Sequence, residues 1–280
     1  MASVEALTLN GVDLNGLVSN VESVAGLLRT PVRRGESIRV PGRHGALRRA
    51  DRPYDPGEIT LPFWVIGAHP ATGVALTGDE EASSYYARAD ALVALLHAPD
   101  LLFEHTLPDG TSRRCRAELA DEPLDFTRQA GSPLFGRVSV ALSLPDAFWY
   151  EPVLRPAGPY TVVTGAPVEL APFAGATAPM AGLQITFTGP INNPELRQPE
   201  TGSFVAYDAV IGSGQTVTID CDTETITASG GLVVDYTKLR YRPPRWFELD
   251  PTAGLEVQLV HTTGGSRTFT VAGQRKFLTG

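Results

Sequence analysis

The amino-acid sequence predicts a mainly β protein in two parts, an N-terminal α+β domain over residues 1–150 and an antiparallel β-sandwich or barrel over residues 151–280. Short segments in which every second residue is apolar, the pattern of half-buried strands, occur along much of the chain. One segment, residues 79–97, has the apolar spacing of an amphipathic helix. From residue 183 onward, short apolar segments alternate with glycine-rich turns, which is typical of a sandwich or a barrel.

The first domain is expected to contain a long β-hairpin over residues 33–66. Residues 38–40 and 59–65 carry apolar side chains at every second position and predict its two strands. Residues 41–57 between them are rich in Gly, Pro and Arg and predict a wide basic tip. Because Pro62 removes a backbone donor from the second strand, we expect it at a sheet edge or a bulge.

Eight arginines fall within the 24 residues from 29 to 52 of a chain whose net charge is −8. We interpret the hairpin tip as an arm that pairs with carboxylates of a neighbouring copy, and the alternative is a solvated loop. Nucleic-acid binding is disfavoured by the pI near 5.2 and by the presence of Tyr54 alone for base stacking. The residues expected at the subunit interface are Arg33, Arg34, Arg39, Arg43, Arg48, Arg49 and Arg52.

The rest of the first domain is expected to hold one helix among strands. Asn10-Gly11 marks a tight turn near the N-terminus. The helix runs from Asp79 to about His97, with Asp79 as its cap and Glu80 and Glu81 at the positive end of its dipole. Its apolar face, which includes two tyrosines expected in the core, consists of Ala82, Tyr85, Tyr86, Ala89, Leu92, Val93 and Leu96.

A hairpin over residues 101–107 and 111–120 and a strand over residues 134–144 complete this domain. The proline-flanked aromatic segment 145–152 predicts a stiff connection to the second domain. Residues 153–182, rich in Ala, Pro and Gly, predict no element. The strands expected after them are 183–187, 204–207, 216–220, 232–236, 246–249, 255–260 and 268–271.

The sequence carries no catalytic or cofactor motif that we recognise, so we expect a protein that is not an enzyme and that needs no cofactor or metal. Asp220, Asp222 and Glu224 would share a strand face and could hold Ca²⁺, but a solvated edge or loop is the favoured interpretation. Glu104 and His105, as strand neighbours, point to opposite faces and are not an acid–base pair. Cys115 and Cys221 have no metal-ligand spacing and predict free buried thiols.

The start of the sequence lacks a basic segment followed by an apolar one, so we expect no signal peptide. No apolar run reaches the roughly 18 residues of a membrane span, and no membrane insertion is expected. A reducing compartment during folding fits the cysteine usage.

Several segments resemble the distal tail proteins of long-tailed bacteriophages. In the first half these are PGRHG followed by ITLPFWVIG, then LVALLHAP, then DAFWYEP. In the second half, LQITFTGPINNPELRQPETG, VIGSGQTVTID and RWFELDPTAGLEVQLV resemble the galectin-like module of these phage tail proteins. The resemblance covers almost the whole chain, apart from residues 153–182 and 237–244.

The resemblance implies a structural protein of the virion, located at the tail tip and folded in the cytoplasm of the bacterial host. Members form a hexameric ring whose N-terminal domains, a β-sandwich or split barrel with one helix, are closed by a belt hairpin. Galectin-like β-sandwich domains project outward. The implied partners are further copies of the chain, the tail tube protein and a tail hub or baseplate protein, with the tape measure protein as another candidate. No stable binding of nucleic acid is expected.

Two other functions stay open. A carbohydrate-binding adhesion module would use an exposed aromatic residue, for which Trp246 is the best candidate, although a role as a core anchor is favoured for it. A tail-associated glycosidase would need two positioned carboxylates, which the sequence alone does not identify.

Overall fold

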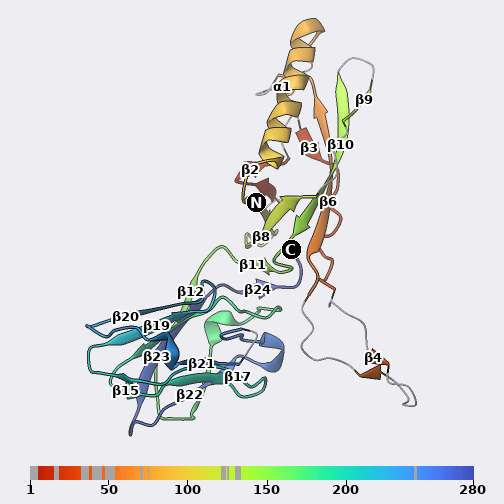
Figure 1. Cartoon of the computed structure of the whole chain (residues 1–280). Helices are drawn as coiled ribbons and strands as arrows, with labels where there is room; N and C mark the ends of the chain where they lie inside the picture. The colour runs from red at the N-terminus through yellow and green to blue at the C-terminus, as the bar shows by residue number, and fades with distance from the viewer. Residues whose placement is uncertain are drawn as a thin grey trace. The chain divides into compact units, whose positions relative to one another are not determined.

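The computed structural model describes residues 6–15, 19–32, 38–39, 46–47, 54–69, 72–74, 76–120, 124, 126–129, 134–242 and 245–280. The chain forms two compact units (Figure 1): unit 1 comprises residues 1–149 and 278–280, and unit 2 comprises residues 150–277. Both are built from antiparallel sheets, and α1 (Gly78–Leu96) is the one α-helix among the described residues. The predicted mainly β fold is therefore confirmed.

The strands of unit 1 follow the order β2-β1-β7-β8-β10-β6-β3, and β9 pairs with β10. The bounds are β1 Ala6–Leu9, β2 Val12–Asp13, β3 Ser19–Val21, β6 Gly57–Ile66, β7 Leu101–Thr106, β8 Ser112–Leu119, β9 Thr127–Gln129 and β10 Phe135–Leu144. A short strand, β11 (Trp149–Tyr150), lies where the unit ends. The predicted hairpin over residues 101–120 is the β7–β8 pair, in register from Leu101↔Ala117 to Thr106↔Ser112.

The longest ladder of the unit joins β6 and β10, from Phe135↔Ile66 to Leu144↔Gly57. Every second side chain of β6 from Ile59 to Val65 is buried, with at most 1% of its surface exposed. β10 alternates in the same way, as its sequence predicts. Period-two burial of this length fixes the register, because a slip by one residue would expose the whole apolar face.

Pro62 lies at a bulge, as expected, although β6 is not an edge strand. Its carbonyl accepts a hydrogen bond from the Glu22 amide at 2.9 Å, so its nitrogen faces the same neighbour. On that side, Val21 pairs with Phe63 and Ala25 forms a bridge with Thr60. Between these two pairs, residues 22–24 lie opposite residues 61 and 62. The extra residue makes a β-bulge, so the strand does not need a backbone donor at Pro62.

Helix α1 begins one residue before the predicted start, and its cap differs. Thr77 is the last extended residue and occupies the N-cap position, so Asp79 is already inside the first turn and the predicted Asp79 cap is wrong. Asp79 and Glu80 still lie at the positive end of the helix dipole. Glu81 is buried, and its Oε1 accepts a hydrogen bond from the Leu134 amide at 2.6 Å.

The two tyrosines of α1 have different environments. Tyr85 is 2% exposed and packs against Gly136, where even a Cβ atom would lie 2.1 Å from the Tyr85 hydroxyl. Tyr86 is 50% exposed, so its predicted place in the core is wrong. Its hydroxyl accepts a hydrogen bond from Arg128 Nη1 at 3.0 Å, which shows that it lies on the polar margin of the helix.

The long hairpin predicted over residues 33–66 has a different pairing. β4 (Ile38–Arg39) pairs with β5 (Ala46–Leu47), whereas β6 pairs with β10 and β3. The apolar alternation of β6 therefore arises because β6 is buried in the main sheet of unit 1. It does not indicate pairing with residues 38–40. Of residues 33–53, only the backbone of β4 and β5 is described.

Unit 2 contains two five-stranded sheets with the orders β12-β23-β14-β19-β20 and β13-β22-β16-β17-β21. Their bounds are β12 Arg155–Val162, β13 Pro167–Glu169, β14 Gln184–Thr188, β16 Glu195–Gln198, β17 Ser203–Tyr207, β19 Thr216–Asp220, β20 Thr225–Ser229, β21 Leu239–Tyr241, β22 Glu256–Val260 and β23 Arg267–Gly273. Shorter elements are β15 Ile191–Asn192, β18 Val210–Ile211, β24 Lys276–Phe277 and the 3₁₀ turns Ala171–Phe173, Tyr236–Lys238 and Pro251–Ala253.

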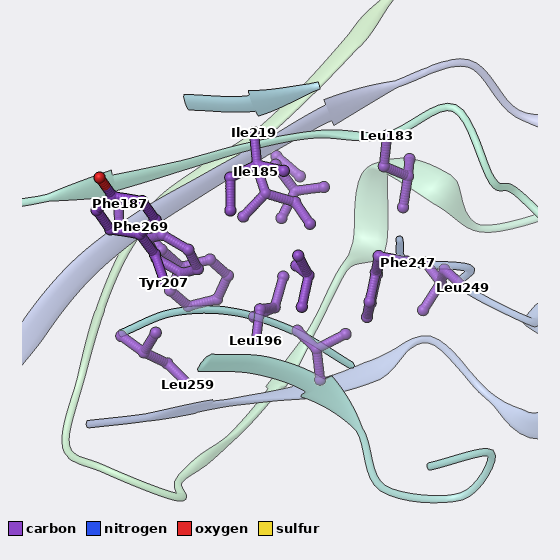
Figure 2. Packing of buried hydrophobic residues seen from close by; sticks show 14 of the residues in the cluster. Leu183, Ile185, Phe187, Leu196, Tyr207, Ile219, Phe247, Leu249, Leu259 and Phe269 are labelled. Atoms are coloured by element: carbon purple, nitrogen blue, oxygen red, sulfur yellow. The ribbon is translucent and has the colours of Figure 1, made fainter. Parts of the chain in front are cut away.

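Side chains from both sheets meet in one apolar core (Figure 2). Ile185 and Ile219 come from the first sheet and Leu196 and Leu259 from the second, and all four are fully buried. The chain segment before β22 adds Phe247, which is also fully buried. This arrangement of two facing antiparallel sheets is the predicted β-sandwich.

Five of the seven strands predicted in this half are present within a few residues. The predicted strand 232–236 is wrong, because Asp235 caps the 3₁₀ turn Tyr236–Lys238 by accepting a hydrogen bond from the Thr237 amide. The predicted strand 246–249 is reduced to a single bridge between Leu249 and Met180. Its apolar residues are buried in the core between the two sheets and do not form a hydrogen-bonded strand pair beyond this bridge.

Candidate functional site: the root of the arginine-rich arm

We call residues 33–53 the arm, and residues 25–32 and 54–60 the arm root. The predicted interface residues Arg33, Arg34, Arg43, Arg48, Arg49 and Arg52 lie outside the described residues, and of Arg39 only the backbone is described, in β4. The arm root is described on both sides, and it is the part of unit 1 that positions the arm.

The two ends of the arm meet at the root. The Asp55 amide donates a hydrogen bond to the Val32 carbonyl at 2.7 Å, which brings the residues that flank the arm side by side. Two further bonds between Ala25 and Thr60, at 3.0 and 3.1 Å, join the root to β6. The ring of Tyr54 packs edge-on against Phe148, with the ring centroids 4.9 Å apart. The residues that flank the arm therefore meet in a closed, packed base.

Close packing leaves little freedom in this base. A Cβ atom on Gly26 would lie 2.3 Å from the Glu58 carbonyl oxygen, and the Gly26 φ of +103° is strained for other residues. The Leu27 carbonyl accepts a hydrogen bond from the Gly280 amide at 2.7 Å, so the last residues of the chain belong to unit 1. Arg113 Nη1 likewise donates to the Thr279 carbonyl at 2.8 Å.

A hollow of about 210 Å³ lies at the arm root. Its lining includes the apolar side chains of Val32, Leu144 and Trp149 and the charged side chains of Arg29 and Glu58. Leu28, beside it, is 79% exposed and Val32 is 55% exposed. The arm root thus has both apolar and charged side chains at its described surface.

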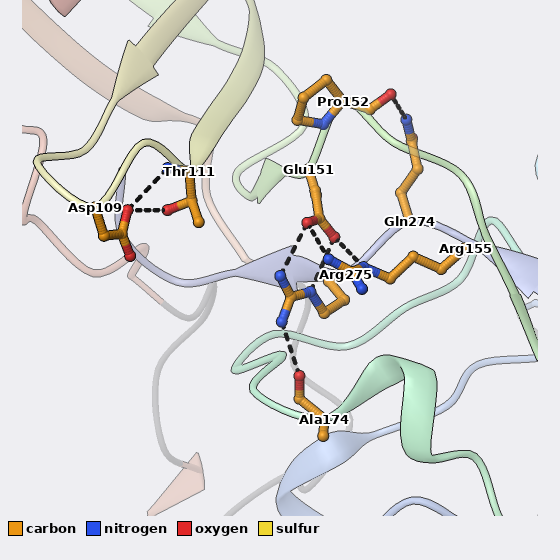
Figure 3. A network of polar contacts seen from close by, with 8 residues as sticks. All are labelled: Asp109, Thr111, Glu151, Pro152, Arg155, Ala174, Gln274 and Arg275. Atoms are coloured by element: carbon orange, nitrogen blue, oxygen red, sulfur yellow. Dashed lines mark hydrogen bonds and ion pairs between the residues drawn. The ribbon is translucent and has the colours of Figure 1, made fainter. Parts of the chain in front are cut away.

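Unit 2 contains one strongly held charge cluster (Figure 3). Glu151 is 7% exposed, and its carboxylate receives two hydrogen bonds from Arg155, at 2.5 and 2.6 Å, and two from Arg275, both at 2.9 Å. Arg275 also donates to the Ala174 carbonyl at 2.9 Å. We call Glu151, Arg155 and Arg275 the arginine clamp. The Glu151 amide also donates to the Arg275 carbonyl at 3.0 Å, so the clamp joins the first and last segments of unit 2.

Electrostatics of the clamp follow from this geometry. The hydrogen bonds from Arg155, with those from Arg275, lower the pKa of the Glu151 carboxyl from 4.5 to about 2. Glu151 is thus ionised at all physiological pH values and has the role of a fixed anion. This cluster was not predicted from the sequence: Glu151 and Arg155 are four residues apart, but Arg275 lies 124 residues from Glu151.

The other candidate residues have structural roles. Asp220 accepts hydrogen bonds from the amides of Asp222 and Thr223, at 2.9 and 3.1 Å, and so shapes the turn between β19 and β20. Glu104 pairs with Arg114 at 3.0 Å, whereas His105, its neighbour in β7, is buried. Their opposite faces are as predicted.

Trp246 is 8% exposed and belongs to the core of unit 2, which confirms the core interpretation. Both cysteines are free, and burial raises the pKa of Cys115 far above its usual range and that of Cys221 to about 12. Within the described ranges, no group of three or more His, Cys, Asp or Glu side chains could hold a metal ion. No helix in this part of the chain has the length and apolar character needed to cross a membrane.

Residues 175–271, which cover most of unit 2, match the family described as siphovirus-type tail component, C-terminal domain. Over these residues the chain is similar to a tail component of siphoviruses. This match and the likeness described next confirm the resemblance to the distal tail proteins that the sequence shows. No curated protein matches the chain.

The fold of the whole chain is similar to that of the Dit protein (gp 19.1) of phage SPP1, described as a paradigm of the hub adsorption apparatus in phages that infect Gram-positive bacteria. The two are 18% identical, the match covers 98% of this chain and 100% of that one, and the TM-score is 0.64. A chain of the phage p2 baseplate in its activated conformation matches at 10% identity over 96% of this chain and 98% of that one, with a TM-score of 0.43. The family match over residues 175–271 supports a structural role in a phage tail.

Proposed function

We propose that the chain forms a closed hexameric ring at the tip of a siphophage tail, with the tail tube protein on one side and a tail hub or baseplate protein on the other. The match to the tail-component family and the likeness to the SPP1 Dit fold support this proposal. In it, unit 1 closes the ring, unit 2 serves attachment to neighbouring tail proteins, and the role of the chain is structural rather than catalytic.

The arm is the observation that carries the proposal. Its seven arginines outnumber Glu36 and Asp51, so the arm has a net charge of +5. The rest of the chain has a net charge of −13, which gives the total of −8. The hydrogen bond between Val32 and Asp55 closes its base, so unit 1 does not need the arm to complete its sheet. A basic arm on an acidic protein is electrostatically complementary to further copies of the same protein.

The test replaces residues 34–53 by a short Gly-Ser linker and retains Tyr54 and Asp55, which belong to the packed root. We expect light scattering and native mass spectrometry to find an oligomer of six for the full chain and a monomer for the variant. The circular dichroism spectrum should keep its helix and sheet content, because β6 and β10 pair along their full length without the arm.

A matched pair of variants separates charge from length. An arm with all seven arginines replaced by Gln should lose assembly, and an arm with the same residues replaced by Lys should retain part of it, because Lys keeps the charge without the planar guanidinium. High salt should weaken the ring in the same direction. If the shortened variant assembles as well as the full chain, the arm is a solvated loop and the proposal for it is wrong.

A further inference from the structure

Residues 278–280 follow unit 2 in the chain but belong to unit 1. The chain thus returns to its first unit after it has formed the whole of the second one. There the Gly280 amide donates a hydrogen bond of 2.7 Å to the carbonyl of Leu27 in the arm root. A segment made after unit 2 therefore supports a turn of the arm root that is made long before it.

The turn around Leu27 is held from two sides. On one side, Ala25 forms two backbone hydrogen bonds with Thr60 of β6, at 3.0 and 3.1 Å. On the other side, the Leu27 carbonyl accepts the bond from Gly280. Leu27 is buried, so its backbone carbonyl needs a partner within the protein. Without Gly280, this part of the arm root loses one of its two attachments to the rest of unit 1.

Gly280 also packs against the indole ring of Trp149. Gly280 is buried, and a Cβ atom at this position would overlap the ring, so the site has room for a glycine only. Trp149 is 2% exposed and packs edge-on against Phe103, with the ring centroids 5.7 Å apart. Trp149 is also one of the side chains that line the hollow at the arm root. Gly280 is therefore part of the packing that builds the wall of this hollow.

An arginine of β8 holds the same segment. Arg113 Nη1 donates to the Thr279 carbonyl at 2.8 Å and to Thr279 Oγ1 at 3.4 Å. Hydrogen bonds from a charged donor are stronger than those between neutral groups. The next residue, Arg114, points to the opposite face of the strand and pairs with Glu104 at 3.0 Å. Of these two neighbours, Arg113 is thus the one that anchors residues 278–280.

We propose that residues 278–280 are a latch, and that the arm root takes its closed form only when this segment is in place. The β6–β10 ladder does not involve the latch, so the main sheet of unit 1 can form first, as N-terminal domains do during synthesis. The arm root closes later, when the chain beyond unit 2 arrives. The consequence for assembly rests on the ring proposed above: chains that lack the latch do not join it.

Hydrogen exchange over residues 22–32 measures the latch directly. The measurement uses the variant with the shortened arm, so that contacts within a ring do not add protection. Deletion of residues 278–280 should raise the exchange rate there by about tenfold or more, and Arg113→Gln should raise it by about threefold, because each change removes hydrogen bonds that hold the segment. The matched control is Arg114→Gln on the same strand, which should leave this rate unchanged.

The effect on assembly is measured with the full arm. Native mass spectrometry should find no hexamer for the deletion of residues 278–280, whereas Arg114→Gln should assemble as the parent does. The latch is refuted if exchange over residues 22–32 is unchanged by the deletion, or if the deletion variant assembles normally. It is also refuted if β6 and β10 exchange faster to the same extent, since that is a general loss of stability. A parent that stays monomeric refutes the ring instead, and exchange over residues 22–32 then decides the latch by itself.

Discussion

Replacing Glu151 by Gln removes the anion of the arginine clamp while keeping the size of the side chain. The pKa of the Glu151 carboxyl is lowered from 4.5 to about 2, and the difference corresponds to about 3 kcal/mol of stabilisation by the ionised form. The glutamate side chain is 9% exposed and that of Arg275 20%, so solvent screens this interaction less than it does a surface pair. We therefore expect Glu151→Gln to lower the free energy of unfolding of unit 2 by about 2–3 kcal/mol at neutral pH.

The sign of the pH dependence follows from the lowered pKa. A carboxyl whose pKa is lower in the folded state contributes its full stabilisation above its ordinary value of 4.5 and loses it as the pH falls toward 2. The difference in stability between the parent and Glu151→Gln should accordingly shrink over this window. The parent should thus lose more stability on acidification than the variant does.

Hydrogen exchange measured by mass spectrometry in urea gives the opening free energy of peptides from unit 2 separately from those of unit 1. The matched control is Glu200→Gln, an exposed glutamate of the same unit, which should change the free energy by less than about 0.5 kcal/mol. The reasoning is refuted if Glu151→Gln behaves like this control at neutral pH. It is equally refuted if the two proteins lose the same stability between pH 4.5 and pH 2.

Two further predictions concern unit 2. His261 is 5% exposed and its pKa is lowered from 6.5, mainly by burial, so its contribution to stability is present above pH 6.5 and falls as the pH drops through that value. Thermal unfolding of His261→Gln should therefore depend less on pH than that of the parent, and an unchanged dependence would contradict this. Expressed alone, residues 150–277 should give a cooperatively unfolding β protein, whereas residues 153–277, which lack Glu151, should unfold at lower urea concentration. An aggregated or unfolded 150–277 fragment would count against a separately folding unit.

Apolar periodicity predicted the elements whose faces are cleanly divided between core and solvent. The strand 134–144 and the hairpin over 101–120 are found nearly as expected, because their buried positions are occupied by apolar residues at every second place. The helix was predicted within a residue at each end. The predicted Asp79 cap and the predicted burial of Tyr86 were wrong, because Asp79 lies inside the first turn and Tyr86 lies at the edge of the apolar face, where its hydroxyl bonds Arg128.

Strands β12 and β16 were not predicted, because apolar side chains do not occupy every second position in them. Each departure has a physical reason. β12 contains Pro156 and Pro159, which normally argue against a strand, but it is the edge of its sheet and needs no donors on its outer side. β16 reads as polar because Gln198 points inward. This side chain is fully buried and donates to the carbonyls of Asp250 and Gly254, both at 2.8 Å. A satisfied polar group in a core position cannot be told from a solvated one by its residue type.

The sequence shows which charged residues the arm contains, but it does not show which contacts form the arm root. The arginine content of residues 33–52 is visible in the sequence, whereas the bond between Val32 and Asp55 that closes the arm root is a contact across 23 positions with no pattern of its own. The arginine clamp has the same difficulty, since Glu151 and Arg275 come together only when unit 2 is complete. Contacts between distant segments depend on the finished fold and leave no local signal.

The separation of arm and sheet has a consequence for how the protein can vary. β6 starts at Gly57, after the end of the arm at residue 53, and its ten pairs with β10 do not involve the arm. Changes in the arm are therefore expected to alter the charge offered to a neighbouring copy at little cost in the stability of unit 1, because the β6–β10 ladder forms without the arm. Single exposed ion pairs contribute only about 0–1 kcal/mol, but a closed ring repeats each of them at every interface. Assembly in this protein is accordingly expected to respond to salt and to arm charge over a range in which both units stay folded.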